Sequence, residues 1–211
     1  MPFTKGRLIV IEGIDGAGKS TQARMLYDEL RRRGIATILS REPTDSKYGQ
    51  KIRELAQDGR EAASPEEEYR LFMEDRKIHV NDLILPALKD GKVVILDRYY
   101  FSTIAYQSAR GLDPEKIRRE NEAFCPIPDI VLLMDVPTNT GIHRIKQYRK
   151  ETPNLFEKKS YLDKVARNLA HLDDGFIVRI NGSGSLEDVQ RRIMSYVAPI
   201  LNKTTPLSRV E

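Results

Sequence analysis

The stretch VIEGIDGAGKSTQ, residues 10–22, joins the end of an apolar run to a loop that is rich in glycine. Residues 13–20, GIDGAGKS, match the pattern G-x-x-x-x-G-K-[ST] in full. The glycines let successive backbone N–H groups turn inward, and the helix expected after them presents its positive end to an anion. A glycine-rich turn without a ligand is the alternative, but the strand and helix patterns on either side argue against it. The stretch therefore predicts a site for a nucleoside triphosphate.

Further side chains fit a triphosphate and its metal ion. Lys19 can reach the β- and γ-phosphates, and the hydroxyl of Ser20 can hold Mg²⁺. Asp97 ends the apolar run VVILD, as a carboxylate associated with Mg²⁺ should. Arg98 follows directly, and a cation here can hold a second anion that faces the triphosphate. An acceptor phosphate fits this position better than water does, and a salt bridge at a strand end on the surface is the alternative.

Short apolar runs alternate with helical patterns along the whole chain. The expected strands are residues 7–12, 36–40, 93–97, 130–135 and 176–180. Their nearly continuous apolar character is typical of strands buried on both faces of a parallel sheet. The expected helices are residues 20–33, 65–88, 113–123, 138–149, 157–171 and 185–201. This alternation predicts an α/β fold with a doubly wound, five-stranded parallel sheet and helices on both faces, in one domain over residues 1–211.

Two helix boundaries are marked in the sequence itself. Gly34 is expected to stop the first helix, behind the basic residues 31–33 that suit the negative end of a helix dipole. Ser64 is expected as the N-cap of the long second helix, with Pro65 at the first position and Glu67 completing a capping box. In a sheet of this kind, ligands bind beyond the carboxyl ends of the strands.

The composition restricts the class of protein further. The 211 residues are 40% hydrophobic and 31% charged, with a formal net charge of +4. This charge fits an anionic ligand or a nucleic acid, and an ordinary excess of surface lysine explains it equally well. Cys125 is the only cysteine, which excludes an internal disulfide and predicts a reducing, cytoplasmic compartment. The three histidines lack metal-ligand spacing, and no apolar run is long enough for a signal peptide or a membrane helix.

Other classes of nucleotide-binding protein find less support. The chain has no N-K-x-D motif, which disfavours a GTPase, and no L-S-G-G-Q signature, which disfavours an ABC-type ATPase. An ATPase that acts on DNA would need a larger chain. A kinase with a small anionic acceptor remains the leading interpretation.

A series of motifs then occurs in one order along the chain: EGIDGAGKSTQ, REPT followed by GQKIR, LFMEDR, VVILDRYYFSTIAYQ, PDIVLLMDVP and FEKKSYLDKV. With them the sequence resembles the thymidylate kinases, a family of nucleoside monophosphate kinases, from about Leu8 to Leu201. The resemblance implies that the protein phosphorylates dTMP to dTDP with ATP and Mg²⁺, in dTTP synthesis. It also implies a homodimer with ATP and dTMP as partners, and neither a nucleic-acid polymer nor a membrane.

The resemblance assigns the loop to ATP and several residues to the chemistry. The ATP-binding residues would be Gly13, Ile14, Asp15, Gly16, Ala17, Gly18, Lys19, Ser20 and Thr21, with Arg144 from a lid. Mg²⁺ would be held by Ser20 and supported by Asp97. The catalytic residues would be Lys19, Asp97, Arg98 and Arg149.

The acceptor site implied by the resemblance comprises Asp15, Arg41, Glu42, Phe72, Arg76, Arg98, Thr103, Tyr106 and Gln107. In it, Asp15 meets the 3′-hydroxyl group of the sugar, and Arg98 clamps the acceptor phosphate. Phe72 stacks on thymine and Arg76 donates to its exocyclic oxygen. Their four-residue spacing puts both on one helix face, although core packing explains that spacing better when it is taken alone. Thr103 and Gln107 would read the base, and Tyr106 would crowd the 2′ position and favour deoxyribose.

A basic lid is expected over residues 143–156. In one subgroup of the family an arginine of the loop reaches the γ-phosphate, whereas here Gly16 follows Asp15, as in the subgroup whose lid supplies this cation. Its cations are Arg144, Lys146, Arg149 and Lys150, and a solvated basic helix end is the alternative. Leu155 stands where the family often has an arginine, so Arg149 is our first choice for the catalytic cation and Lys150 the second. The tail, residues 202–211, lacks an apolar pattern and is expected to fray.

Two alternative functions stay open at this point. Glu74 stands where the family usually has a small residue, and its carboxylate could pair with Arg76 and alter the base preference. The acceptor could then be dUMP or a deoxynucleoside, although a deoxynucleoside kinase would carry an acid-arginine-serine signature where this chain has DRY. The second alternative is a catalytically altered nucleotide-binding regulator.

Overall fold

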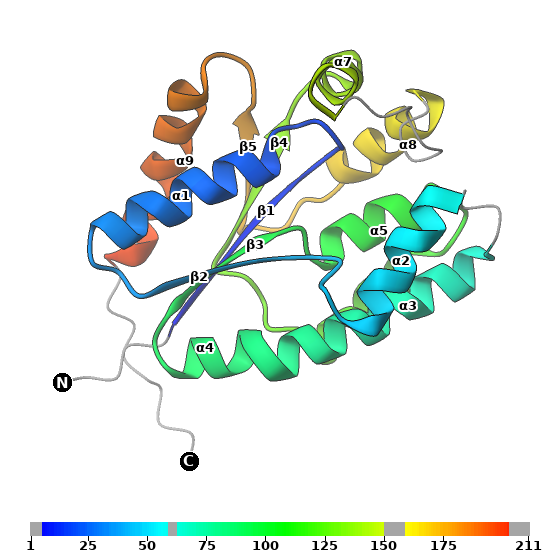
Figure 1. The fold of residues 1–211 in the computed structure, drawn as a ribbon, viewed down its shortest axis with the longest axis horizontal. Coiled ribbons are helices and arrows are strands. Elements are labelled where there is room, and N and C mark those ends of the chain that lie inside the picture. Colours follow the sequence, from blue (N-terminus) through cyan, green and yellow to red (C-terminus); the bar gives the residue numbers. More distant parts are fainter. Residues whose placement is uncertain (1–5, 59–62, 150–158, 203–211) are drawn as a thin grey trace.

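The computed structural model describes residues 6–58, 63–149 and 159–202 (Figure 1). They contain one five-stranded sheet with the strand order β2-β3-β1-β4-β5, in which every neighbouring pair is parallel. The strands are β1 (Arg7–Gly13), β2 (Thr37–Arg41), β3 (Val93–Asp97), β4 (Ile130–Asp135) and β5 (Ile177–Asn181). The predicted fold class is confirmed, and the strand bounds differ from the expected ones by one residue at most.

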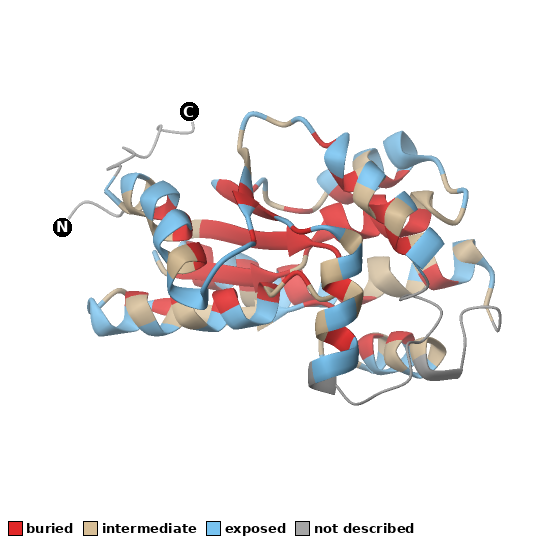
Figure 2. Cartoon of the chain, turned by 90° about the horizontal axis from the view of Figure 1, so that it is seen from above, coloured by how far each residue is buried: buried red, intermediate tan, exposed pale blue. Residues whose placement is uncertain are grey.

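The central strands form the core of the sheet because apolar side chains cover both of their faces. Every residue of β3 is buried, and in β4 only the last residue is exposed. The edge strands β2 and β5 are less buried, which agrees with their positions at the two ends of the strand order. Figure 2 shows this distribution, with the buried residues concentrated in the strands and in the helix faces turned toward them.

The helices are α1 (Lys19–Arg32), α2 (Lys47–Asp58), α3 (Pro65–His79), α4 (Leu85–Lys89), α5 (Tyr100–Ser108), α6 (Pro114–Glu122), α7 (Thr138–Arg149), α8 (Lys159–Ala170) and α9 (Leu186–Leu201). Figure 1 shows α1 and α9 on one side of the sheet and α3, α4 and α5 on the other. None of the helices in the described residues combines the length and the apolarity that a bilayer crossing requires.

The local signals for helix ends are confirmed. Gly34 has a φ of 75°, and its N–H donates to the Arg31 carbonyl at 3.0 Å while that of Ile35 reaches the Leu30 carbonyl at 3.0 Å. These two bonds form a Schellman motif, which requires a left-handed residue and therefore favours glycine. Ser64 and Glu67 form the predicted capping box at the start of α3.

The sequence expectation is wrong in three details of the helices. The single helix expected over residues 65–88 is divided into α3, a π-helical turn (Val80–Ile84) and α4. α2 and α5 were not predicted. In α5, eight of nine residues are buried, from Tyr100 to Gln107, so the segment lacks the alternation of apolar and polar faces that marks a surface helix.

The register of the sheet brings three distant segments to one edge. Ile11 in β1 and Arg41 in β2 both pair with Asp97, the last residue of β3. The loop after β1, the segment after β2 and the turn after β3 therefore emerge side by side at the carboxyl ends of their strands. The backbone N–H of Glu42 continues this pairing, donating to the Asp97 carbonyl at 3.1 Å.

Two regions named from the sequence extend beyond the described residues. The expected lid, residues 143–156, is described to residue 149, and the expected frayed tail, residues 202–211, only at residue 202. Both remain predictions, as does the extent of one domain over the whole chain.

Candidate active site

The glycines of the loop after β1 adopt backbone conformations that other residues rarely reach. Gly13, Gly16 and Gly18 have φ values of 145°, 77° and 92°. A Cβ atom on Gly16 would lie 2.2 Å from the carbonyl oxygen of Gly141 in α7. The loop therefore depends on glycine both for its left-handed turns and for its close contact with α7.

Lys19 is the first residue of α1 and folds back onto the loop. Its Nζ donates a hydrogen bond to the Ile14 carbonyl at 2.8 Å, and the side chain is buried. Burial, together with the positive charge of Arg98, lowers the pKa of Lys19 to about 8. A bound phosphate would oppose both effects, because an anion beside the ammonium group favours its charged form.

Ser20 and Asp97 meet where α1 begins and β3 ends. The hydroxyl of Ser20 donates to Oδ2 of Asp97. The other carboxylate oxygen, Oδ1, is buried and has no hydrogen-bond partner among the described residues. A hydroxyl beside a carboxylate with an orphaned oxygen fits Mg²⁺, which prefers oxygen ligands and takes much of its shell from phosphates and water.

Arg98 is held in an unusual backbone conformation. Within residues 6–58, 63–149 and 159–202 it is the only residue other than glycine with a positive φ, at 75°. Its guanidinium group forms an ion pair with Asp15 and donates to the Ser102 hydroxyl at 2.8 Å. The side chain is 18% exposed, so the alternative of a solvated salt bridge at the surface does not describe it. A strained residue of this kind persists only where its surroundings fix it, and such positions cluster at functional sites.

Glu12, which the sequence analysis did not single out, fixes the turn that follows Arg98. Its fully buried carboxylate accepts the backbone N–H groups of Tyr99 at 2.8 Å and Ser102 at 3.1 Å, and the Ser102 hydroxyl at 2.6 Å. Burial raises the pKa of Glu12, although Arg98 and these hydrogen bonds oppose the shift. The one sequence signal was a carboxylate at the end of an apolar run, which says nothing about its partners.

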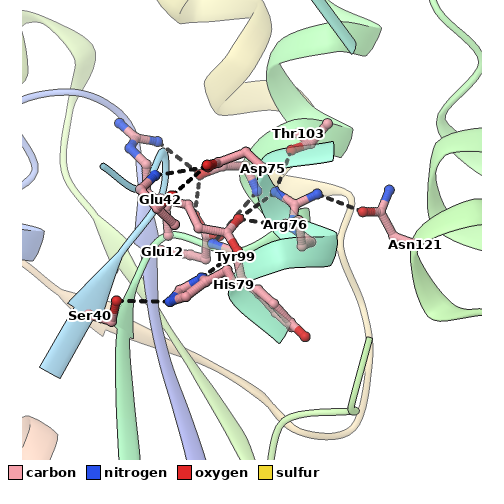
Figure 3. A network of polar contacts seen from close by, with 12 residues as sticks. Glu12, Ser40, Glu42, Asp75, Arg76, His79, Tyr99, Thr103 and Asn121 are labelled. Atoms are coloured by element: carbon pink, nitrogen blue, oxygen red, sulfur yellow. Dashed lines mark hydrogen bonds and ion pairs between the residues drawn. The ribbon is translucent and has the colours of Figure 1, made fainter. Parts of the chain in front are cut away.

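Arg76 lies at the centre of a buried polar network (Figure 3). Its Nε and Nη2 donate to Oε2 of Glu42 at 2.8 and 2.6 Å, and both side chains are buried. Nη1 donates to Asn121 Oδ1 at 2.6 Å, and Nη2 also donates to Thr103 Oγ1 at 2.9 Å. These contacts use four of the five N–H groups of the guanidinium. Asn121 was not predicted, and nothing in its local sequence indicates this contact.

The network continues from Glu42 to the edge strand. Oε1 of Glu42 lies 3.0 Å from His79 Nδ1, and His79 Nε2 lies 2.8 Å from the hydroxyl of Ser40. Burial alone would raise the pKa of Glu42, but Arg76 and His79 outweigh it and hold the pKa below its usual value. Asp75 holds the segment after Glu42 in place, because its carboxylate accepts the backbone N–H of Thr44 at 2.8 Å.

The remaining base-reading candidates lie on α3 and α5. Phe72 is partly buried in α3, between the turns that carry Glu68 and Arg76. Gln107 is fully buried, and its Nε2 donates to Glu68 Oε2 at 3.0 Å. Tyr106 is buried beside Arg98, with its ring centroid 5.1 Å from Arg98 Cζ.

Glu74 and Arg41 have other neighbours than the sequence led us to expect. Glu74 pairs with Lys77 at 2.7 Å, so the suggested pairing with Arg76 is wrong. The reason is that Arg76 points inward to Glu42 while Glu74 lies on the outer face of α3. Arg41 is exposed, 3.7 Å from Asp45, and lines a cleft of about 740 Å³ between α1 and β2 instead of joining the network of Arg76.

The lid is described in part. Nη2 of Arg144 donates to the Gly182 carbonyl at 3.2 Å, and a Cβ atom on Gly18 would lie 3.9 Å from its Nη1. Arg144 therefore lies beside the phosphate loop. The side chain of Arg149, together with Lys150 and Leu155, falls outside the described residues, so the choice of catalytic lid cation remains a prediction.

Known proteins resemble this chain over most of its length. The family model described as thymidylate kinase matches residues 11–193. The thymidylate kinase of Desulfotalea psychrophila is 47% identical over 201 residues, which cover 95% of this chain and 98% of the relative. The probable thymidylate kinase of Archaeoglobus fulgidus is 43% identical over 195 residues, 92% of this chain and 96% of the relative. The predicted family is confirmed: the chain belongs to the thymidylate kinase family.

Proposed function

We propose that this protein transfers the γ-phosphoryl group of ATP to the phosphate of dTMP, forming dTDP and ADP in the synthesis of dTTP. Family membership supports this activity. The observation that carries the proposal is the ion pair between Asp15 of the phosphate loop and Arg98 after β3. This ion pair connects the loop at residues 13–21, which would hold ATP, to Arg98, which would hold the acceptor phosphate.

The donor side needs positive charge and fixed geometry. The backbone N–H groups of the loop at residues 13–21 and the ammonium group of Lys19 would hold the phosphates of ATP. Ser20 and Asp97 would hold Mg²⁺, directly or through its waters. When bound, the metal ion neutralises charge on the β- and γ-phosphates.

On the acceptor side, the phosphate of dTMP would displace Asp15 from Arg98. Asp15 would then accept a hydrogen bond from the 3′-hydroxyl group of the sugar. Because the acceptor phosphate is already ionised, no general base is required. Lys19 and Arg98 would offset the repulsion between the two phosphate groups and hold them in line. A cation of the lid, with Arg149 as first choice, would close over ATP and keep water out.

The base would lie among groups of fixed polarity. Arg76 retains one N–H on Nη1 with no partner in the described residues, and it would donate to the exocyclic oxygen O4 of thymine. Phe72 would stack on the ring, and Thr103 and Gln107 would complete the polar edge. Tyr106 would crowd the 2′ position and so favour deoxyribose. Arg41 and Glu42 would line the site, Glu42 through its contact with Arg76.

The decisive experiment is release of ADP from ATP–Mg²⁺ by the purified protein with dTMP, dUMP, dCMP, UMP or thymidine added. We expect strong turnover with dTMP, weaker turnover with dUMP and close to none with the other acceptors. A maximum on dUMP or on thymidine would replace the acceptor in this proposal. ADP release that does not depend on any monophosphate would overturn the proposal and indicate an ATPase. The absence of ADP release with every acceptor would also overturn it and favour a regulatory ATP-binding protein.

We also propose a homodimer and a cytoplasmic location. A homodimer follows from the family resemblance, and Ile78 at the end of α3 and Leu85 at the start of α4 supply exposed apolar side chains. Light scattering coupled to gel filtration measures the mass in solution and would reject the dimer if it gave that of one chain. A cytoplasmic location fits the nucleotide substrates and the single cysteine.

A further inference from the structure

One buried amide in the site has a carbonyl oxygen that accepts no hydrogen bond from the part of the chain that the structure describes. Gln107 is 0% exposed, and its Oε1 has no hydrogen-bond partner among the described residues. The other end of the same amide, Nε2, donates to Glu68 Oε2 at 3.0 Å. Buried polar atoms almost always have partners in native proteins, so an orphaned oxygen beside a ligand site indicates a donor that the ligand supplies.

We propose that Glu68 determines base specificity by fixing the orientation of the Gln107 amide, so that Oε1 faces the N–H of a pyrimidine ring. The inference rests on the proposed function, since it concerns the base of the acceptor nucleotide. A carboxylate accepts hydrogen bonds and cannot donate them. The amide must therefore turn its NH₂ group toward Glu68, which leaves the carbonyl oxygen at the other end.

The surroundings of Glu68 hold its carboxylate in place. Glu68 is 1% exposed, and Arg110 forms an ion pair with Oε2. A second nitrogen of Arg110 donates to the Ala63 carbonyl at 3.0 Å, which anchors the guanidinium to the start of α3. These contacts fix the position of the Glu68 carboxylate beside the amide of Gln107.

The positions of the side chains along their helices put this amide next to the stacking aromatic. Glu68, Phe72 and Arg76 follow one another at intervals of four residues and so share a face of α3. Thr103 and Gln107 have the same spacing on α5. Arg76 contacts Thr103 and Glu68 contacts Gln107, so the two contacts between these helices lie on either side of Phe72 along α3.

The chemistry of the bases explains why the orientation matters. Thymine and uracil carry a hydrogen on N3, whereas N3 of cytosine is an acceptor. Oε1 of Gln107 would accept a hydrogen bond from N3–H of thymine or uracil. In cytosine it would instead face the lone pair of N3, which is also an acceptor. In a site without water, such a mismatch leaves two buried acceptors unpaired, which is how hydrogen-bonding sites reject near analogues strongly.

The test is the substitution Glu68→Gln with kcat/KM measured for dTMP, dUMP and dCMP. An amide at position 68 can donate or accept, so the Gln107 amide can turn over and offer its NH₂ group to N3 of cytosine. We expect kcat/KM for dTMP divided by kcat/KM for dCMP to fall by roughly tenfold or more. The corresponding ratio for dTMP and dUMP should stay unchanged, because thymine and uracil present the same edge to Gln107. Arg76 still opposes the amino group of cytosine, so the preference should weaken without reversing.

Two further variants separate specificity from structure. In the double variant E68Q/Q107E, a carboxylate at position 107 again offers only an acceptor to the base, and the discrimination against dCMP should return. Arg110→Lys keeps a cation beside the carboxylate of Glu68 and should leave the ratio of kcat/KM for dTMP to kcat/KM for dCMP within about twofold of the wild-type value. KM for ATP should stay constant throughout.

The outcomes distinguish this inference from the proposed function. If the unaltered protein does not phosphorylate dTMP, the proposed function fails. If it does, but E68Q lowers turnover of all three acceptors in equal proportion, Glu68 is merely structural and the inference is overturned. The inference is also overturned if E68Q keeps full activity and an unchanged ratio of kcat/KM for dTMP to kcat/KM for dCMP.

Discussion

Glu42 and Arg76 form a buried ion pair in which Oε2 accepts two N–H groups of one guanidinium, at 2.8 and 2.6 Å. The two residues come from the segment after β2 and from α3, and each has further buried partners. Burying two charges is costly, and removal of one partner leaves the other uncompensated. This pair therefore couples the stability of the fold to the geometry of the proposed base site.

We expect Glu42→Gln to lower the free energy of unfolding by roughly 3–5 kcal/mol, because it leaves the charge of Arg76 buried without a counterion. Urea denaturation followed by circular dichroism measures this quantity. The matched control is Glu74→Gln, which removes a solvated pair with Lys77 and should change stability by about 0.5 kcal/mol or less. Equal losses in both variants would contradict the role assigned to the buried pair.

The same pair gives stability a defined dependence on pH. The pKa of Glu42 in the folded protein lies below its ordinary value of 4.5, because Arg76 and His79 outweigh the effect of burial. The stabilising contribution is therefore fully present above about pH 4.5 and is lost as the pH falls through the lower, folded-state pKa. Unfolding free energies of the wild type and of Glu42→Gln should converge as the pH is lowered from 6 to 3. A difference that grows toward acid pH would refute this sign.

Removal of the Arg98 side chain should abolish most phosphoryl transfer while leaving the binding of ATP nearly unchanged. We expect Arg98→Ala to lower kcat/KM for dTMP by about 10³-fold or more, since the acceptor phosphate loses its clamp. The dissociation constant of ATP should change by about threefold or less, as read by calorimetry. Arg98→Lys keeps the charge but loses the fork that bonds Asp15 and Ser102, so it should recover only part of the activity. Wild-type turnover in Arg98→Ala would show that the clamp is another residue.

The orphaned oxygen of Asp97 leads to an expectation about the metal ion. Asp97→Asn should raise the Mg²⁺ concentration for half-maximal activity by roughly tenfold, because the carboxylate that would support the ion is lost. Asp135→Asn is a matched control, since Asp135 also ends a parallel strand but is exposed. A titration of activity with Mg²⁺ at constant ATP compares them. The same shift in both variants would mean that Asp97 has no particular part in holding the metal ion.

Two glycines with similar backbone angles should respond differently to alanine. Gly16 and Gly34 have φ values of 77° and 75°, but an added Cβ meets the backbone of Gly141 only at Gly16 and nothing within 4 Å at Gly34. Gly34→Ala should lower stability by about 1 kcal/mol and leave activity unchanged. Gly16→Ala should in addition displace the loop from α7 and lower kcat/KM on the order of 10²-fold. Similar activities in the two variants would show that this contact does not shape the loop.

Much of the fold was predictable because its signals are local. Continuous apolar runs gave all five strands, and Gly34 and Ser64 gave helix boundaries. The helix α5 was not predicted because it is buried on almost all sides, so its sequence lacks the alternation of apolar and polar faces typical of an amphipathic helix. The division of the helix from α3 to α4 by a π turn left no mark in the pattern of residues.

The sequence by itself determined the glycine-rich loop expected to hold phosphates, because that loop consists of contiguous residues whose glycines permit backbone conformations that other residues rarely adopt. Only the tertiary structure decided what surrounds that loop. Arg98 acquires its positive φ, and Glu12, Glu68, His79 and Asn121 acquire their partners, through contacts between segments far apart in the chain. A polar side chain carries no local sign of the partner that it meets, since side chains on the same helix can point to the core or to water. Glu74 and Arg76 illustrate this: two residues apart on α3, one pairs with exposed Lys77 and the other with buried Glu42.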